Sequence, residues 1–186
     1  MRSKGFQLLL DNAGYRSSRV NKGYKSIRAH TLSSYKINRK VVIIAGSTGT
    51  GKTDLLHQMK KDGHNVIDLE RLANHRGSAF GDLGLSEQST QQQFENDLSF
   101  HWLKTDKSKP VFIESESRKI GKVLIPDDIW MQMLNGIYLK IDMDADRRIK
   151  NLIKDYGDHS KNDLKTRIHR ISKKLGGQNT KIAINL

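Results

Sequence analysis

Short apolar runs alternate with amphipathic segments through the middle of the chain. Four runs rich in Val, Ile and Leu are expected to form strands, over 41–45, 65–69, 111–113 and 137–141. Segments with one apolar face are expected to form helices, over 52–61, 90–103, 126–134, 144–156 and 160–175. Strands separated by helices are joined by crossover connections, which place the strands parallel. The pattern therefore predicts an α/β domain of three layers, with helices on both faces of a parallel sheet.

The segment before this core has a different character. Residues 5–14 predict a short amphipathic helix, and residues 15–40 read as a basic connector with a short helix near 24–34. The predicted organisation is an N-terminal segment, 1–35, followed by the α/β domain, 36–186.

Composition narrows the chemistry that the chain can perform by itself. Its 186 residues include no cysteine, so disulfides, thiolate metal sites and a cysteine nucleophile are excluded within this chain. No apolar run approaches the roughly 18 residues that a membrane helix needs, and the N-terminus lacks a secretory signal pattern. We therefore expect a cytoplasmic protein without a membrane partner.

The net charge of +13 is concentrated at the two ends of the chain. Residues 1–40 carry ten basic groups and one acid, and residues 147–186 carry eleven basic groups and three acids. Clustered cations gain affinity for nucleic acid by releasing the counterions of its phosphates. The distribution favours RNA or another polyanionic partner, although a purely solvated basic surface would give the same counts.

The clearest motif follows the strand predicted over 41–45. Residues 46–53 match the pattern G-x-x-x-x-G-K-[ST] and lead into a predicted helix, which is the context that a phosphate-binding loop requires. Its members are Gly46, Ser47, Thr48, Gly49, Thr50, Gly51, Lys52 and Thr53. Backbone N–H groups would surround a phosphate, Lys52 would supply a charge, and the Thr53 hydroxyl could ligate Mg²⁺. The motif alone fits a nucleoside triphosphate as well as a prenyl diphosphate.

Two carboxylates follow the strand predicted over 111–113. Glu114 and Glu116 come at its carboxyl end, where open α/β sheets bind ligands, and Arg118 follows two residues later. On a continuing strand the two glutamates would point the same way, so one cleft could use both. They could hold Mg²⁺ through water, act as a base or orient a nucleobase, and ordinary ion pairing in a loop is the plain alternative.

A loop rich in Gly and Ser is predicted over 74–89, and its first part carries charged and aromatic side chains. Small residues would let a ligand or an RNA backbone approach, while His75, Arg76 and Phe80 offer charge and stacking. By itself, this segment is weak evidence for a ligand site, and an ordinary surface loop is the simpler interpretation.

Taken together, these motifs resemble those of the tRNA 2-selenouridine synthase family. The resemblance rests on residues 1–4, Gly23-Tyr24-Lys25-x-x-Arg28, the loop 46–53, His75-Arg76-Gly77-Ser78-Ala79-Phe80-Gly81, residues 94–96, Glu114-x-Glu116-Ser117-Arg118-x-Ile120-Gly121 and Leu175-Gly176-Gly177. The phosphate-binding loop is common to many families, whereas the strings over 75–81 and 114–121 are much more specific. The resemblance implies a P-loop NTPase-like domain preceded by a partial C-terminal segment of a rhodanese domain.

In that family a rhodanese domain that uses a cysteine precedes the P-loop domain. The resemblance identifies residues 1–35 as a rhodanese remnant and connector, and 36–186 as a P-loop domain shortened at its C-terminal end. The catalytic cysteine would then lie outside this chain, for which a separate rhodanese-domain protein is one source. We therefore expect a fragment, or one half of a split transferase.

The resemblance also implies a reaction in two stages on the wobble uridine of certain tRNAs. The sulfur of 2-thiouridine is geranylated by geranyl diphosphate, and selenium from selenophosphate then displaces the geranylated sulfur. The implied catalytic residues are Lys52, Glu114, Glu116 and Arg118. The residues expected to bind the substrate or the tRNA are His75, Arg76, Ser78, Phe80, Tyr24, Lys25, Arg28 and Arg148.

Two other functions are compatible with the same residues. A P-loop kinase or ATPase acting on a small molecule would use the same loop, with Arg147 and Arg148 as part of a lid. A fragment that only binds RNA, or that folds poorly, would expose Leu8, Leu9 and Leu10 of the first predicted helix. Phosphoryl transfer from ATP identifies the first alternative, and the solution behaviour of the purified chain identifies the second.

Overall fold

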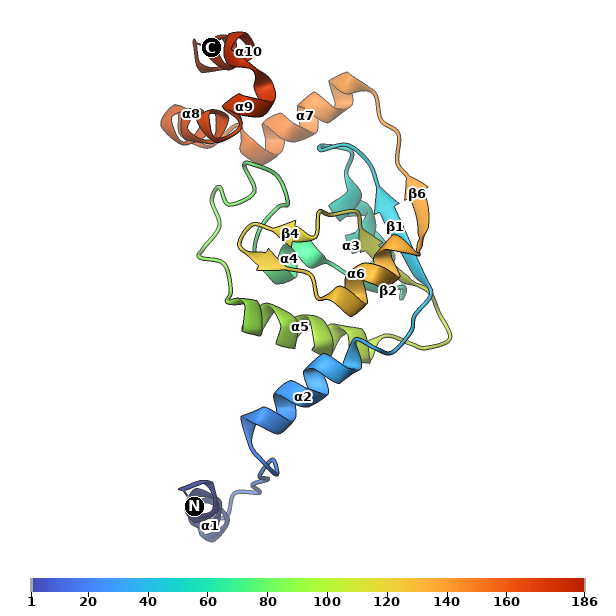
Figure 1. Cartoon of the computed structure of the whole chain (residues 1–186), viewed down its shortest axis with the longest axis vertical. Helices are drawn as coiled ribbons and strands as arrows, with labels where there is room; N and C mark the ends of the chain where they lie inside the picture. Colours follow the sequence, from blue (N-terminus) through green and yellow to red (C-terminus); the bar gives the residue numbers. More distant parts are fainter. Residues whose placement is uncertain (1, 186) are drawn as a thin grey trace.

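The centre of the molecule is a four-stranded sheet in which every strand pairs in parallel. The structure is a computed structural model that describes residues 2–185. The strands are β1 (Val41–Ala45), β2 (Asn65–Ile67), β3 (Val111–Glu114) and β6 (Ile137–Lys140), in the spatial order β2-β3-β1-β6. Because β1 lies between β3 and β6, the residues that follow these three strands emerge at one edge of the sheet (Figure 1). The predicted parallel sheet is confirmed.

The alternation of side chains along β1 shows how the two faces of the sheet are covered. The covering helices are α3 (Lys52–Lys61), α5 (Gln91–Lys104) and α6 (Asp127–Leu134). Val42 and Ile44 pack with Leu56 of α3 on one face. Val41 and Ile43 belong to the larger core on the other face, with residues of α5 and α6. The three-layer arrangement is therefore confirmed.

β6 is the exception to this cover. It forms an edge of the sheet, and all four of its side chains are exposed, including Ile137, Tyr138 and Leu139. The expectation that helices cover both faces thus holds for the other three strands and is wrong for β6, because the chain after β6 leads away from the sheet (Figure 1).

The second strand is shorter than the predicted 65–69. β2 ends at Ile67, and Asp68 begins α4 (Leu69–Ala73). The Asp68 carboxylate accepts a hydrogen bond from the backbone N–H of Arg71 at 2.8 Å and so caps the helix. The predicted end of this strand is therefore wrong, because Asp68 caps a helix through the N–H of Arg71 rather than continuing the sheet.

A small hairpin that no sequence pattern predicts closes one side of the core. It joins β4 (Lys119–Ile120) to β5 (Val123–Leu124) in antiparallel pairing, with Gly121 at a φ of +56° in the turn. Ile120 and Val123 are buried in the main core. Two residues in each strand are too few for a periodic pattern, so packing alone defines this element.

The two N-terminal helices differ in how they contact the rest of the chain. α1 (Arg2–Asn12) lies apart from the sheet at one end of the molecule (Figure 1). Leu8 and Leu9 are exposed there, whereas Leu10 is partly buried, so only two of the three leucines named for the alternative of a poorly folding or RNA-binding fragment are exposed. α2 (Tyr24–Ser34), which has the predicted bounds, packs along α5.

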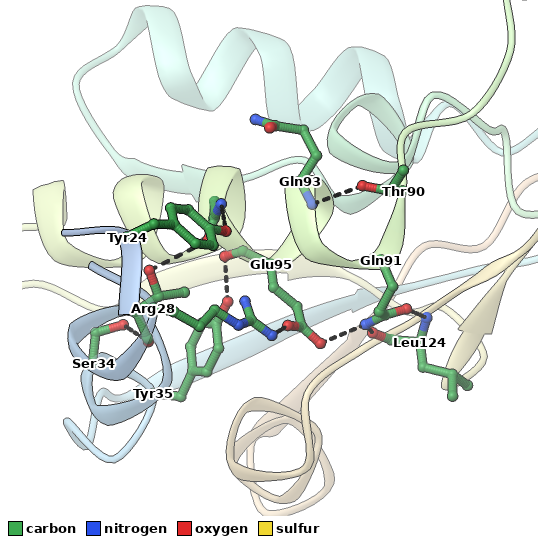
Figure 2. Close-up of polar contacts among 11 residues, drawn as sticks. Tyr24, Arg28, Ser34, Tyr35, Thr90, Gln91, Gln93, Glu95 and Leu124 are labelled. Atoms are coloured by element: carbon green, nitrogen blue, oxygen red, sulfur yellow. Dashed lines mark hydrogen bonds and ion pairs between the residues drawn. The ribbon is translucent and has the colours of Figure 1, made fainter. Parts of the chain in front are cut away.

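Figure 2 shows the polar contacts between α2 and α5. Arg28 forms an ion pair with Glu95, and the Tyr35 hydroxyl donates to the backbone carbonyl of Glu95. The buried hydroxyls of Ser34 and Ser99 share a hydrogen bond of 2.8 Å. Tyr35 itself is 1 % exposed and belongs to the main core. The end of the N-terminal segment therefore contributes to the core of the domain that follows, and the predicted domain boundary stays a prediction.

The C-terminal part forms a helical arm at the end of the molecule opposite to α1 (Figure 1). Its helices are α7 (Ala145–Tyr156), α8 (Lys161–Arg170), α9 (Ser172–Leu175) and α10 (Gly177–Asn185). The helix predicted over 160–175 is interrupted at Ile171, and α10 has no counterpart among the predicted elements. Arg167 ties the arm to Asp82 in the loop after α4 through two hydrogen bonds of 2.7 and 2.9 Å. Within residues 2–185, every helix is too short or too polar to cross a membrane.

Leu98→Ala should destabilise the domain strongly, because Leu98 is fully buried where α5 packs against the sheet. Removing its side chain leaves a cavity, and we expect the free energy of unfolding to fall by about 2–5 kcal/mol. The matched control is Leu103→Ala on the same helix. That side chain is exposed, so its removal should change the value by about 0.5 kcal/mol or less. Urea denaturation measures both, and equal losses would contradict this packing.

Candidate functional site

The phosphate-binding motif forms a loop between β1 and α3. Gly49 and Gly51 have φ angles of +84° and +73°, which other residues adopt only with strain. A Cβ on Gly49 would also lie 2.8 Å from the backbone oxygen of Arg148. The Lys52 Nζ donates to the backbone oxygen of Gly46 at 2.9 Å. The lysine therefore lies within the loop, where such lysines contact the terminal phosphates of a ligand.

This loop forms one wall of a cavity of about 430 Å³. The other walls come from α4, the loop after α4, the residues after β3, and α7. Their lining residues are Glu70, Arg76, Gly77, Ser78, Ser115, Glu116, Asn151, Lys154, Asp155 and Tyr156. Of the predicted site residues outside the loop, Arg76, Ser78 and Glu116 are thus brought to Lys52.

Glu70 and Glu116 form a hydrogen-bonded carboxyl pair in this cavity, with Lys52 close enough to influence both. Burial raises the pKa of Glu70 to about 8, and the Glu116 carboxylate adds to this shift while Lys52 opposes it. Burial also raises the pKa of Glu116, and the hydrogen bond from Glu70 opposes that rise. The hydrogen bond therefore favours the proton on Glu70, as donor, over Glu116, as acceptor.

Glu114 lies beneath this cavity rather than in its wall. Its side chain is 2 % exposed, and its Oε1 accepts a hydrogen bond from the backbone N–H of Glu70 at 2.8 Å. Its Oε2 has no hydrogen-bond partner within residues 2–185. Burial, with a further contribution from Asp68, raises the pKa of Glu114 to about 8. The expectation that a continuing strand aligns Glu114 with Glu116 is wrong, because β3 ends at Glu114.

The two specific motif strings, residues 75–81 after α4 and 114–121 after β3, pack closely against each other. A glycine of each string lies against a side chain of the other. A Cβ on Gly77 would lie 2.3 Å from a carboxylate oxygen of Glu116. The imidazole of His75 is enclosed in the same way, because a Cβ on Gly81 would lie 2.7 Å from its Cε1 and one on Gly121 would lie 2.7 Å from its Cδ2. Glycine at these positions lets the loop, the ring and the carboxylate approach this closely.

α7 joins the phosphate-binding loop to the loop after α4. The Asn151 Nδ2 donates to the backbone oxygen of Gly49 at 2.7 Å. Farther along the helix, the Tyr156 hydroxyl shares a hydrogen bond of 3.1 Å with the hydroxyl of Ser78. The Tyr156 ring also lies 5.6 Å from the guanidinium of Arg76, a cation–π contact. α7 thus contacts two walls of the cavity.

Arg148 and Phe80, both predicted site residues, contact residues of the cavity wall without lining the cavity themselves. The Arg148 Nε donates to the backbone oxygen of Thr48 at 3.1 Å, and the Phe80 ring lies 5.8 Å from that of Tyr156. The residues lining the cavity that the sequence pattern does not predict include Glu70, Asn151, Lys154 and Tyr156. Asn151 could have been found from its spacing, because it lies three residues beyond Arg148 on the same helix face.

Four predicted site residues lie away from this cavity. Arg118 forms an ion pair with Asp127 at the start of α6. Arg28 and Tyr24 hydrogen-bond to side chains of α5 (Figure 2), and Lys25 is exposed on α2. Their roles in catalysis or tRNA binding stay predictions.

The residues around the loop fit a magnesium ion that arrives with a phosphate ligand. Thr53 lies in the first turn of α3 and lines the cavity beside Lys52. Protein-bound Mg²⁺ keeps several waters and takes its other ligands from one or two side chains and from substrate phosphates. In the part of the chain that the structure describes, no cluster of three or more His, Asp or Glu side chains could hold a metal unaided. Thr53 would therefore add a protein ligand to a metal bound chiefly by phosphates.

Comparison with known proteins identifies the family to which the chain belongs. A family model described as the tRNA 2-selenouridine synthase AAA domain matches residues 39–185. The chain belongs to this family. A tRNA 2-selenouridine synthase of Nitrosomonas europaea is 38 % identical over 161 residues, which are 83 % of this chain and 41 % of that protein. One from Shewanella denitrificans is 33 % identical over 182 residues, which are 95 % of this chain and 47 % of that protein.

The chain spans less than half the length of these tRNA 2-selenouridine synthases. A structure of AMPPCP-bound DnaA from Aquifex aeolicus aligns with 77 % of the chain and 54 % of that structure, at 21 % identity and a TM-score of 0.32. The resemblance drawn from the motifs is confirmed at the level of the family, and the parallel sheet with its phosphate-binding loop confirms the P-loop NTPase-like fold. The assignment of residues 1–35 to a rhodanese remnant stays a prediction.

The stability of the domain should depend on pH through the buried carboxyl groups. Because folding raises the pKa of Glu114 from 4.5 to about 8, the folded state keeps a proton that the unfolded state loses between these values. The free energy of unfolding should therefore fall as the pH rises from 4.5 to about 8 and then level off. Glu114→Gln removes this titration and should flatten the decline, with Glu70 leaving a residual slope.

Urea denaturation across this pH interval measures the effect of Glu114→Gln. The matched control is Glu87→Gln, whose carboxyl is exposed on the surface and should leave the slope unchanged. A wild-type slope retained in Glu114→Gln would show that this carboxyl ionises normally in the folded chain.

Proposed function

We propose that this chain is the diphosphate- and tRNA-binding half of a tRNA 2-selenouridine synthase. In this proposal it binds geranyl diphosphate in the phosphate-binding loop and transfers the geranyl group to the sulfur of 2-thiouridine at the tRNA wobble position. The observation that carries the proposal is the single cavity in which Lys52, the pair Glu70–Glu116 and Arg76 lie together. The printed names of the relatives that match most of the chain support tRNA as the substrate.

The cavity suits the departure of diphosphate. As the carbon–oxygen bond breaks, negative charge grows on the diphosphate oxygens, and cationic groups already in place stabilise it. Lys52 lies within the loop, and Arg76 and Lys154 line the same cavity. The N-terminus of α3 directs its positive end to the same place. Mg²⁺, when bound through Thr53, would add its charge to these oxygens.

The transfer balances without a redox partner. The sulfur of 2-thiouridine forms a bond to C1 of the geranyl group, the bond from C1 to the diphosphate oxygen breaks, and the N3 proton of the base leaves. A base has to take this proton, because S-alkylated thiouridine carries none at N3. The hydrogen bond from Glu70 and the charge of Lys52 both favour the ionised form of Glu116, which lines the cavity beside Lys52, so Glu116 is the group proposed to accept the proton.

The helical arm offers cations for the tRNA backbone. Its exposed basic side chains include Arg147, Lys150, Lys173, Lys174 and Lys181. Because α7, the first helix of the arm, contacts the phosphate-binding loop through Asn151, an RNA backbone bound along the arm would lie beside the cavity. Binding of this kind should weaken steeply with salt.

The second stage would need a group that this chain lacks. Selenium from selenophosphate replaces the geranylated sulfur in the proposed sequence, and the cysteine implied for this stage is absent from the 186 residues. A rhodanese domain outside this sequence would supply it. When selenophosphate is added to the chain alone, we therefore expect the reaction to stop at geranylated tRNA.

Lys52→Ala should weaken the binding of geranyl diphosphate, because it removes a charge that lies within the loop. The loss of a hydrogen bond from a charged group predicts a Kd about 10- to 100-fold higher. Isothermal titration calorimetry in the presence of Mg²⁺ measures the change. The control is Lys60→Ala at the opposite end of α3, which should bind like the wild type. Equal affinity of wild type and Lys52→Ala would overturn the proposal.

The reaction itself is tested with tRNA that carries 2-thiouridine. Incubation with geranyl diphosphate and Mg²⁺ should give a geranylated wobble nucleoside that mass spectrometry detects, and Lys52→Ala should lose it. ATP is the competing ligand for a loop of this type. Phosphoryl transfer from ATP to a small molecule, without any geranylated nucleoside, would replace the proposal with a kinase activity.

A further inference from the structure

A second, smaller cavity of about 210 Å³ adjoins the phosphate-binding cavity. The two cavities share Thr53, Glu70 and Arg76 as lining residues. The rest of the second cavity is lined by His57, Asp68, Arg71, Asn74, His75 and Leu85. Ligands bound in the two cavities would therefore meet at the shared residues.

His75 presents an oriented donor to this second cavity. Its Nδ1 accepts a hydrogen bond from the backbone N–H of Gly77 at 3.2 Å, so the ring proton lies on Nε2. The close backbone of Gly81 and Gly121 occupies the space at Cε1 and Cδ2. Nε2 is the ring atom left to face the cavity, and it makes no hydrogen bond to any residue from 2 to 185. Burial lowers the pKa of His75, which keeps the ring neutral at physiological pH.

The remaining lining combines planar groups with hydrogen-bond acceptors. Imidazole and guanidinium groups, here those of His57, His75, Arg71 and Arg76, stack on nucleobases in RNA-binding proteins. The buried Asp68 carboxylate is already held by the His57 Nε2 at 2.8 Å, and therefore positions that ring. The cavity is also smaller than those that bind drug-sized molecules, which start near 300 Å³. A single heterocyclic ring matches its size and its chemistry.

Other ligands of the family reaction suit this cavity less well. The buried Asp68 carboxylate lines this cavity and not the first one, and its negative charge would repel a phosphate. A prenyl chain needs an apolar channel, yet Leu85 is the one aliphatic side chain among the described residues that line the cavity.

We propose that this second cavity binds the pyrimidine base of the RNA, turned out of its stack beside the phosphate-binding loop. The inference rests on the proposed function and adds to it the place of the acceptor base. The Nε2–H of His75 donates to a carbonyl or thiocarbonyl group of the ring. The shared residues Glu70 and Arg76 place the ring next to the diphosphate. An enzyme that reacts at a base atom has to reach that atom outside the base stack, which costs least in a single-stranded loop.

Photo-crosslinking to the wild-type chain tests this placement. The probe is an anticodon stem–loop RNA with 4-thiouridine at the wobble position, irradiated in the presence of inorganic diphosphate and Mg²⁺. Mass spectrometry should map the crosslink to peptides that contain His75, Arg76 or Leu85. A crosslink confined to α2 or to the arm α8–α10 would overturn the inference.

A cavity-filling variant gives the matched comparison. Leu85 lines the second cavity but not the first, so Leu85→Trp should lower the crosslink yield about tenfold and leave the affinity for geranyl diphosphate unchanged. The control is Leu134→Trp on α6, an exposed position that lines neither cavity and should change neither value. An undiminished crosslink in folded Leu85→Trp would overturn the inference. Should thermal melting show that this variant is unfolded, His75→Phe, which removes the Nε2–H donor and keeps a ring, should show a similar loss.

Failure of this inference is distinguishable from failure of the proposed function. Lys52→Ala should weaken the binding of geranyl diphosphate and keep the crosslink, because Lys52 lines only the first cavity. If the wild type fails to bind geranyl diphosphate while the crosslink maps to His75, the proposed reaction fails and the base-binding cavity stands. If geranyl diphosphate binds while the crosslink maps elsewhere, the inference alone fails.

Discussion

The parallel pairing of β1 between β3 and β6 is the constraint on which the site depends. Ile44 lies opposite Glu114, and just beyond this pair the N–H of Ser115 donates to the Ile44 carbonyl at 2.9 Å. On the other side, the N–H of Ile141 donates to the Ala45 carbonyl at 2.7 Å. Parallel strands end at the same edge, so the phosphate-binding loop, the carboxylates after β3 and the chain toward α7 emerge together. A shift of one residue in this register would turn Glu114 to the opposite face of the sheet.

Burial at this edge of the sheet shifts the pKa values of three glutamate side chains by different causes. Burial raises the pKa values of Glu70 and Glu114 to about 8, whereas the hydrogen bond that Glu116 accepts from Glu70 opposes the rise of the Glu116 pKa. Pairs of carboxyl groups with separated pKa values are a common way to provide an acid and a base in one site. Lys52 lies close enough to lower the pKa values of Glu70 and Glu116, while its Nζ donates to a backbone carbonyl of the loop. The cavity thus combines a cationic loop with a carboxylate that can accept a proton, as the proposed transfer requires.

The contact between α2 and α5 shows that residues of a family motif, Tyr24 and Arg28, can serve to pack two helices together. Arg28 and Tyr24 are of residue types that bind RNA, yet their polar atoms face α5 (Figure 2). Arg28 is partly buried, and its ion pair with Glu95 holds α2 against a helix whose opposite face packs on the sheet. Sequence strings alone do not separate these roles, because Arg and Tyr serve protein and RNA partners with the same atoms.

The sequence by itself determined the elements that depend on neighbouring residues. The strand over 41–45, the helix over 52–61 and the glycine-rich loop between them follow from local apolar patterns and from backbone conformations that glycine allows. Tertiary structure decided which distant side chains meet: it enclosed His75 against Gly121 and placed Tyr156 over the loop after α4. These contacts join segments separated by 40 or more residues, and their energy comes from close packing and burial, which appear only once the sheet and its helices are assembled.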